Sequence, residues 1–274
     1  MPELPEVESV RRSLNPLIEG HAITAVDIHH PNMVKDIGVE AFQEALRQKT
    51  FQNIERRGKH LIFDLDGLFM LIHLRMEGRF LIKDASEAQT KHEHIRFTLD
   101  DGRALIYHDV RKFGTVRLRT QETLHTTPPL LTLGPEPLDE DFTVETLYPK
   151  LGTKRPIKAA LLDQTTMSGI GNIYADEILF CAGLHPAVKA YKVKRPTLKK
   201  IVKCSRSIIH DAVEAGGTTI RTYRNALGID GRFQLNLKVH TLEGMPCTVC
   251  GHPIKKTKVA TRGTYYCPVC QKRR

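Results

Sequence analysis

Several features common in proteins are missing from this sequence. It has no tryptophan, no low-complexity tract and no internal repeat, which argues against a disordered chain or a repeat architecture. It also has no signal peptide and no apolar run long enough to span a bilayer, so we expect a cytoplasmic protein with no membrane partner. What remains is a globular chain of 274 residues, 41% hydrophobic and long enough for two domains.

Acidic residues are the minority charge. The chain has 41 Lys and Arg against 31 Asp and Glu, which gives a net charge of +10. Residues 234–274 have a strong excess of positive charge, with eight basic residues and a single acid, Glu243. Such an excess predicts a polyanionic partner such as nucleic acid, and a merely solvated face is the alternative.

Four cysteines have the spacing of a zinc site. Cys247 and Cys250 form one Cys-x2-Cys pair, and Cys267 and Cys270 form a second after sixteen intervening residues. Each pair places two thiolates on one tight turn, and four thiolates satisfy tetrahedral Zn²⁺. Two disulfides are the alternative, which a reducing cytosol disfavours. The sequence therefore predicts one structural zinc that stabilises a segment too short to build a core.

The first part of the chain predicts a helix followed by β-strands. Residues 5–20 carry apolar side chains at helical spacing, with Pro5 in the first turn and Gly20 at the end. Two pairs of alternating segments each flank an Asp-Gly turn: 60–65 with 68–74, and 94–99 with 103–107. Asp-Gly between alternating segments is a strong hairpin signal. We therefore expect an N-terminal β-sandwich with a helix attached.

Composition changes near residues 126–129 and 134–137, where Pro and Gly mark a linker. Helical patterns follow at 157–163, 173–182 and 197–215. The segment Gly169-Ile-Gly-Asn172 precedes the second of these patterns. Its glycines would let the backbone approach a phosphate at the N-terminus of the helix. The alternative is that the glycines only allow the helices to pack closely. Cys181 and Cys204 lie in apolar helical contexts, and we expect both to be inert core thiols.

The start of the chain offers a candidate nucleophile. Removal of Met1 would leave Pro2 with a free secondary amine, which can attack a sugar aldehyde carbon and form an iminium, or Schiff base. Two carboxylates, Glu3 and Glu6, lie close to it in the sequence. A solvated helix N-terminus is the alternative explanation of these residues.

Seven blocks, in order along the chain, resemble the formamidopyrimidine-DNA glycosylases, bacterial enzymes that repair oxidised purines. The blocks are 1–8 (MPELPEVE), 56–59 (RRGK), 73–78 (HLRMEG), 108–114 (HDVRKFG), 133–138 (LGPEPL), 169–177 (GIGNIYADE) and 262–271 (RGTYYCPVCQ). The resemblance implies a multidomain α+β protein. It would have a β-sandwich with flanking helices at 1–130, a helix–two-turn–helix domain at 131–234 and a zinc-finger hairpin at 235–274.

The resemblance also implies the reaction. The amine of Pro2 would attack C1′ of the damaged nucleotide, Glu3 would move protons, and β- and δ-elimination would then cut the strand on both sides. Lys59 would assist base release and bind a phosphate, and Arg262 would lie near the phosphates on the zinc-finger hairpin. A carboxyl group in a partly desolvated pocket has a raised pKa suited to proton transfer.

Damaged double-stranded DNA is the implied partner, and the target base must leave the stack. The resemblance implies that Met76 and Phe113 fill the space that the extruded base leaves in the duplex, and that Arg111 contacts the orphaned partner base. The expected backbone contacts are His92, Lys154, Lys158, Asn172 and Arg111 itself. Such contacts fix register and make affinity fall with salt.

Residues 215–233 resemble a loop that closes over the extruded lesion, and a plain glycine-rich connection is the alternative. The expected lesion-pocket residues are Glu6, Thr218, Arg221 and Tyr223. Several loop residues depart from the commonest family pattern, among them Arg224, so lesion preference stays open.

Three other functions compete with this one. An endonuclease VIII-type enzyme shares the nucleophile but prefers oxidised pyrimidines. Leu4, with Arg111 and Phe113, favours the purine enzymes. A non-catalytic zinc-ribbon DNA-binding protein would have lost Pro2, Glu3 or Lys59, and all three are present. RNA binding would leave the N-terminal block unexplained. We expect a monomer.

Overall fold

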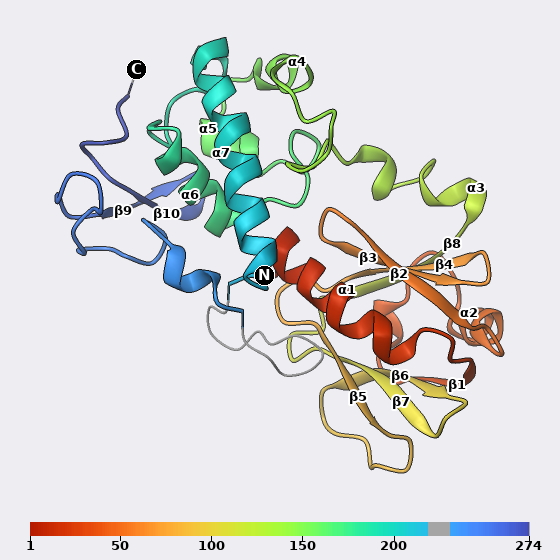
Figure 1. Cartoon of the computed structure of the whole chain (residues 1–274). Helices are drawn as coiled ribbons and strands as arrows, with labels where there is room; N and C mark the ends of the chain where they lie inside the picture. The colour runs from red at the N-terminus through yellow and green to blue at the C-terminus, as the bar shows by residue number, and fades with distance from the viewer. Residues whose placement is uncertain (219–230, 274) are drawn as a thin grey trace. The chain divides into compact units, whose positions relative to one another are not determined.

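The computed structural model describes residues 1–218 and 231–273, which fall into two compact units (Figure 1). Unit 1 comprises Met1–Leu131 with Gly216–Gly231, and unit 2 comprises Thr132–Ala215 with Arg232–Arg274. The segment after Ala215 therefore belongs with the N-terminal part of the chain, although it lies far away in sequence.

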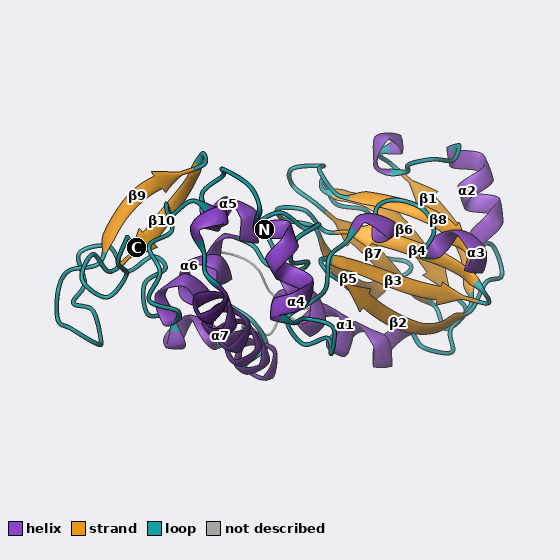
Figure 2. Cartoon of the chain, turned by 90° about the horizontal axis from the view of Figure 1, so that it is seen from above, coloured by secondary structure: helices purple, strands orange, loops and turns teal. Residues whose placement is uncertain are grey.

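Unit 1 is a β-sandwich of two four-stranded antiparallel sheets, as the sequence predicted (Figure 2). The first sheet has the order β1 (Ile23–Ile28), β6 (Glu93–Leu99), β7 (Arg103–His108), β5 (Arg79–Asp84). The second has the order β2 (Phe51–Arg57), β3 (His60–Leu65), β4 (Leu68–His73), β8 (Thr115–Thr120). Both predicted hairpins are confirmed: β3 pairs with β4, and β6 with β7.

Aromatic rings join the two sheets across the core. Phe51 and Phe63 on the second sheet, and Phe80 and Tyr107 on the first, form a chain of edge-to-face contacts. Successive ring centroids are 5.9, 5.4 and 5.4 Å apart, and all four rings are buried. This packing is the geometry that aromatic quadrupoles favour, and it holds the strand ends in fixed positions.

Helix α1 (Leu4–Ile18) confirms the predicted N-terminal helix, and Figure 1 shows it beside β2. The polar face of α1 covers the free edge of that strand. Asn15 Oδ1 accepts the Ile54 N–H at 2.6 Å, and the Arg11 guanidinium donates to the Ile54 carbonyl at 3.4 Å. A covered edge cannot pair with another chain. Two shorter helices, α2 (Val39–Leu46) and α3 (Gln121–Leu124), complete the unit.

Unit 2 is helical and ends in a β-hairpin, again as predicted. Its helices are α4 (Val144–Leu147), α5 (Ile157–Leu161), α6 (Asn172–Cys181) and α7 (Arg195–Glu214), and its strands are β9 (Lys255–Val259) and β10 (Arg262–Tyr266). The three predicted helices correspond to α5, α6 and α7. No helix in the described parts of the chain combines the length and apolarity needed to cross a bilayer.

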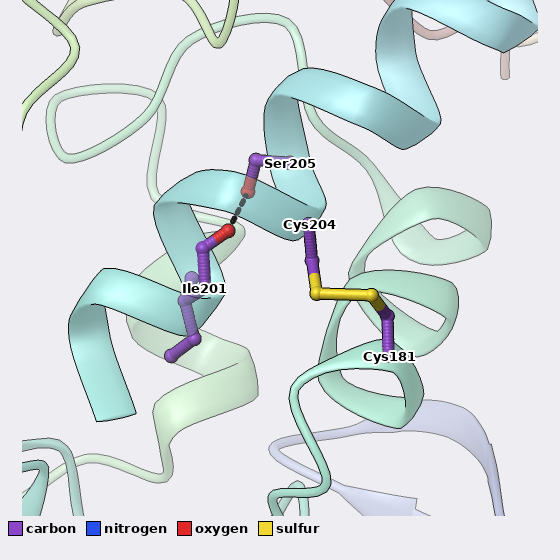
Figure 3. Close-up of a disulfide and its surroundings, with 4 residues drawn as sticks. All are labelled: Cys181, Ile201, Cys204 and Ser205. Carbon is purple, nitrogen blue, oxygen red and sulfur yellow. Dashed lines mark hydrogen bonds between the residues drawn. A yellow bond between two sulfur atoms is a disulfide. The ribbon is translucent and has the colours of Figure 1, made fainter. Parts of the chain in front are cut away.

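Cys181 and Cys204 form a disulfide that links α6 to α7 (Figure 3). Their Cα atoms are 6.0 Å apart, within the range that a disulfide spans. The expectation of two separate core thiols was wrong. Hydrophobic periodicity showed that each cysteine lay on a helix, but it did not show that the two helices face one another at these positions.

Candidate active site and metal centre

Met1 is exposed, but the residues that follow it are buried, and a hydrogen bond holds the Glu3 backbone. Pro2 is buried, and Glu3 is only 2% exposed at the start of α1. The backbone N–H of Glu3 donates to Glu6 Oε2 at 2.8 Å, so a side chain in the first turn of the helix holds the residues before it. This arrangement fixes where the amino end of the protein lies.

Glu6 has a second partner far away in sequence. Its Oε1 accepts the backbone N–H of Thr218 at 2.7 Å, and both groups are buried. Gly217 approaches so closely that an added Cβ would lie 2.9 Å from Glu6 Oε1, and its φ of +82° also suits glycine. One carboxylate therefore joins the start of α1 to the segment that enters residues 219–230.

Lys59 reaches the same place from a tight turn. Gly58 and Lys59 connect β2 to β3, where Arg57 pairs with His60, and Lys59 is 5% exposed. Burial lowers the pKa of the Met1 amine below its ordinary value, and the Lys59 ammonium lowers it further. The carboxylates of Glu3, Glu6 and Glu77 raise the pKa of this amine. A terminal amine here is thus surrounded by carboxylates and one ammonium, and more of it is neutral at pH 7.

Two histidines beside Lys59 were not singled out from the sequence. His60 and His73 face each other across β3 and β4, with ring centroids 4.7 Å apart. Burial lowers their pKa values to about 4 and about 2, so both are neutral at pH 7. His73 Nδ1 accepts the N–H of Arg75 at 2.9 Å, which places the ring proton on Nε2. The Asp66-Gly67 turn sets the register that pairs His60 with His73. The same turn is visible in the sequence, so it could have predicted that the two histidines lie opposite each other.

Two exposed loops carry the predicted stacking residues. Met76 lies between β4 and β5 and is 40% exposed, while Phe113 lies between β7 and β8 and is 53% exposed. The Arg111 guanidinium lies 4.8 Å from the centre of the Phe113 ring. His92 is half-buried next to His108 at the end of β7. Large apolar side chains exposed on rigid loops are suited to insertion between bases.

In unit 2 the four predicted cysteines come together. All four sulfur atoms lie within 4.8 Å of one another, with Cys250 Sγ 3.4 Å from Cys267 Sγ and Cys247 Sγ 3.9 Å from Cys270 Sγ. Ligands at the usual Zn–S distance in a tetrahedron would be ~3.8 Å apart. The cluster therefore fits one zinc ion and needs no rearrangement.

The hairpin between the two cysteine pairs presents Arg262 at its turn. Arg262 is exposed at the start of β10, and its neighbour Gly263 accepts a hydrogen bond from Asn172 Nδ2 at 3.0 Å. Asn172 is the first residue of α6, one position after the N-cap Gly171. The N-terminus of α6 and the hairpin turn are thus joined, and Lys154 is exposed ahead of α5.

Three family descriptions match successive parts of the chain. The formamidopyrimidine-DNA glycosylase N-terminal domain matches residues 1–116, the H2TH domain of the same enzymes matches 133–224, and a zinc finger found in FPG and IleRS matches 244–273. A curated protein of that name from Exiguobacterium sp. is 45% identical, and the match covers 100% of both chains. The chain belongs to the formamidopyrimidine-DNA glycosylase family.

Solved structures agree with this assignment to the glycosylase family. The Lactococcus lactis Fpg in complex with N7-benzyl-Fapy-dG DNA is 40% identical, covers 99% of this chain and 100% of its own, and superposes with a TM-score of 0.92. The same enzyme in complex with oxidised-pyrimidine DNA is 39% identical and superposes with a TM-score of 0.91. That match covers 99% of this chain and 100% of the other. Within this family the cysteine cluster is the zinc finger, so the chain holds one structural zinc.

The structure corrects one expected DNA contact in this glycosylase-family chain. Lys158 is 0% exposed, and its ammonium lies 2.7 Å from Asp176 Oδ1. It also donates to the Gly263 carbonyl at 3.0 Å and to Thr264 Oγ1 at 2.9 Å. A buried, ion-paired ammonium cannot reach a phosphate outside the protein. Lys158 on α5 instead links the β9–β10 hairpin to α6 through its hydrogen bonds and ion pair. A lysine next to basic surface residues gave no sign of this from sequence.

We expect Lys158→Met to destabilise unit 2 by about 3–5 kcal/mol, because it leaves the Asp176 carboxylate buried without its counter-ion. Thermal and urea unfolding would measure the change. Lys154→Met removes an exposed lysine four residues earlier and should leave stability within experimental error. Equal stability of the Lys158 variant and the wild type would contradict the structural role.

The remaining predicted site residues divide between the units. Pro2, Glu3, Glu6, Lys59 and Thr218 come together in unit 1, and Asn172 and Arg262 in unit 2. Arg221 and Tyr223 lie outside the described residues. The structure adds Glu77 beside the amine, which sequence reasoning placed in a matched block without giving it a role.

Proposed function

We propose that this protein is a DNA repair glycosylase that removes oxidised purines, 8-oxoguanine and formamidopyrimidines, from duplex DNA and then cuts the strand. The observation that carries the proposal is the position of Pro2 in a chain of this family: it is buried next to Glu3, whose backbone is held by Glu6, and the Lys59 charge acts on the amine at this end of the chain. The cytoplasm, where bacterial DNA lies, is the proposed location.

The nucleophile in this proposal is the secondary amine of Pro2 after Met1 has been removed. It attacks C1′ of the damaged nucleotide as the bond from C1′ to the base nitrogen breaks. Burial lowers the pKa of the Met1 amine, and the amine of Pro2 attacks in its neutral form. The departing base keeps the bonding electron pair and gains a proton, and the amine loses its N–H proton. Loss of the ring oxygen from C1′ then gives an iminium between Pro2 and the opened sugar.

Glu3 is the proposed proton carrier. It lies beside Pro2 and is 2% exposed, and a protonated carboxyl group there can deliver a proton to the sugar ring oxygen as the ring opens. Lys59 contributes positive charge near the amine, where it can hold a phosphate of the damaged strand.

Strand cleavage follows from the same intermediate. The iminium acidifies the hydrogen on C2′, and loss of that proton expels the 3′ phosphate by β-elimination. Loss of a second proton expels the 5′ phosphate by δ-elimination, and water releases the sugar fragment from Pro2. Arg262 is the proposed contact for the departing phosphates, because its exposed guanidinium suits bidentate phosphate binding.

The remaining proposed contacts keep the base extruded and the duplex in register. Met76 and Phe113 fill the space left by the base, and Arg111 donates to the orphaned cytosine. His92, Lys154 and Asn172 contact the phosphate backbone, which makes affinity fall with salt. We propose the domain division 1–130, 131–234 and 235–274, except that residues 216–231 group with the N-terminal unit, and we propose that the protein acts as a monomer.

The experiment that tests the proposal is borohydride trapping. Duplex DNA carrying 8-oxoguanine opposite cytosine should give a covalent adduct that maps to Pro2 by mass spectrometry, and an oxidised-pyrimidine duplex should give less. An adduct that favours the pyrimidine would move the assignment to the endonuclease VIII type. No adduct on either duplex, from zinc-loaded protein lacking Met1, would leave a DNA-binding protein without this chemistry.

A further inference from the structure

The loop from residue 109 to residue 114 closes around a single buried carboxylate. Asp109 follows β7 and is 0% exposed. Its Oδ1 accepts the backbone N–H of Arg111 at 2.9 Å, and its Oδ2 accepts those of Phe113 and Gly114, also at 2.9 Å. One side chain therefore binds the backbone of both residues proposed to contact the disrupted base pair.

The base of this loop is itself anchored. His94 Nε2 donates to the Asp109 carbonyl at 2.8 Å, and the Asp109 N–H donates to the His92 carbonyl at 3.0 Å. At the far end of the loop, Gly114 lies against the Tyr107 hydroxyl, where a Cβ would overlap the oxygen. Asp109 thus holds the loop from a point that is fixed on strands β6 and β7.

The backbone within the loop is in a demanding conformation. Lys112 has a φ of +58°, which is unfavourable for a side chain of its size. The turn places the Arg111 guanidinium over the Phe113 ring, and Phe113 remains 53% exposed. Three backbone hydrogen bonds to one side chain can offset the cost of this conformation.

We propose that Asp109 is a positioning residue that presents Arg111 and Phe113 to duplex DNA in a preformed arrangement. The proposal rests on the proposed function, since it assumes that these two side chains enter the duplex. Asp109 touches neither base nor sugar, and it acts by reducing the conformational freedom that the two side chains would otherwise lose on binding.

Asp109→Asn tests the proposal with little change in volume. An amide has one acceptor oxygen, so its NH2 group must face either the Arg111 N–H or the two N–H groups of Phe113 and Gly114. Asp101→Asn is the matched control, because Asp101 accepts the Arg103 N–H at 3.0 Å in the exposed turn at the other end of β7. Asp101→Asn should behave as the wild type.

Two DNA substrates distinguish a positioning role of Asp109 from a general loss of protein structure. On 8-oxoguanine duplex, Asp109→Asn should lower kcat/KM by roughly 10- to 100-fold, the effect of losing a hydrogen bond to a charged group. On single-stranded abasic DNA, which has no partner base and no stack to enter, borohydride trapping should equal that of the wild type. Discrimination between cytosine and adenine opposite the lesion should also weaken, because Arg111 is no longer held.

A double-mutant cycle completes the test. Phe113→Ala and Asp109→Asn should be less than additive on duplex substrate, since one removes the Phe113 ring and the other misplaces it. Additive losses, unchanged duplex activity, or equal loss on single-stranded and duplex DNA would each overturn the positioning role. If the wild type traps on neither substrate, the proposed function fails, and this outcome differs from a failure confined to Asp109→Asn.

Discussion

Blocking the amine of Pro2 is expected to abolish strand cleavage and borohydride trapping while DNA binding survives. A retained residue ahead of Pro2 turns the amine into an amide, whose nitrogen lone pair is delocalised and cannot attack C1′. Pro2→Gly should also lose cleavage. A secondary amine gives an iminium that is always cationic, whereas the imine of glycine must gain a proton before it can draw electrons from C2′.

Gel-shift binding and cleavage assays on the same preparations would measure this prediction, with the mass of each chain showing whether Met1 is gone. Pro5→Ala is the matched control, because it removes a proline from the first turn of α1 and leaves the amine intact. Full cleavage by a preparation in which every chain retains an extra residue would exclude Pro2 as the nucleophile.

Loss of the zinc is expected to have the second largest effect. Cys267→Ser removes a buried ligand, and structural zinc contributes apparent binding energies of about 10–16 kcal/mol to small modules. The module from residue 244 to residue 273 should then unfold, which would release Arg262 from the N-terminus of α6. DNA affinity should fall with it, and the thermal unfolding transition of the module should be missing from the melting curve of the variant.

Metal analysis and DNA titrations at fixed salt would check this expectation. Cys204→Ser is the control for loss of a buried cysteine of unit 2 that is not a zinc ligand, and it also breaks the disulfide to Cys181, so its effect on stability shows how much a lost cross-link alone contributes. It should keep one zinc per chain and bind DNA as the wild type does. A Cys267→Ser protein shown to be free of metal, yet with unchanged affinity, would contradict a role for the finger in binding.

Local signals in the sequence were sufficient for most of the fold. Asp-Gly turns set the hairpins and their registers, helical spacing located α1, α6 and α7, and cysteine spacing identified the metal site. These signals depend on residues that are close together in the chain. They succeed because turn geometry and helix periodicity are local properties.

Long-range contacts between side chains were not visible in the same way. The bond from Thr218 to Glu6 joins residues 212 positions apart, and the Lys158–Asp176 pair depends on how α5 packs on α6. The Cys181–Cys204 disulfide depends on the contact between α6 and α7. A lysine reads as a surface residue until its burial is known, and hydrophobic patterns do not report which elements face each other.

The two hydrogen bonds of Glu6 have a consequence for how the enzyme should be produced. One carboxylate holds both the Glu3 N–H and the Thr218 N–H in a chain that still carries Met1, so retention of the methionine leaves both contacts in place. Incomplete removal of the initiator methionine would then leave a mixture of molecules that share this fold and differ in whether the Pro2 amine is free. Activity per milligram would follow the efficiency of the host's methionine aminopeptidase, so preparations should be compared at equal fractions of mature chain.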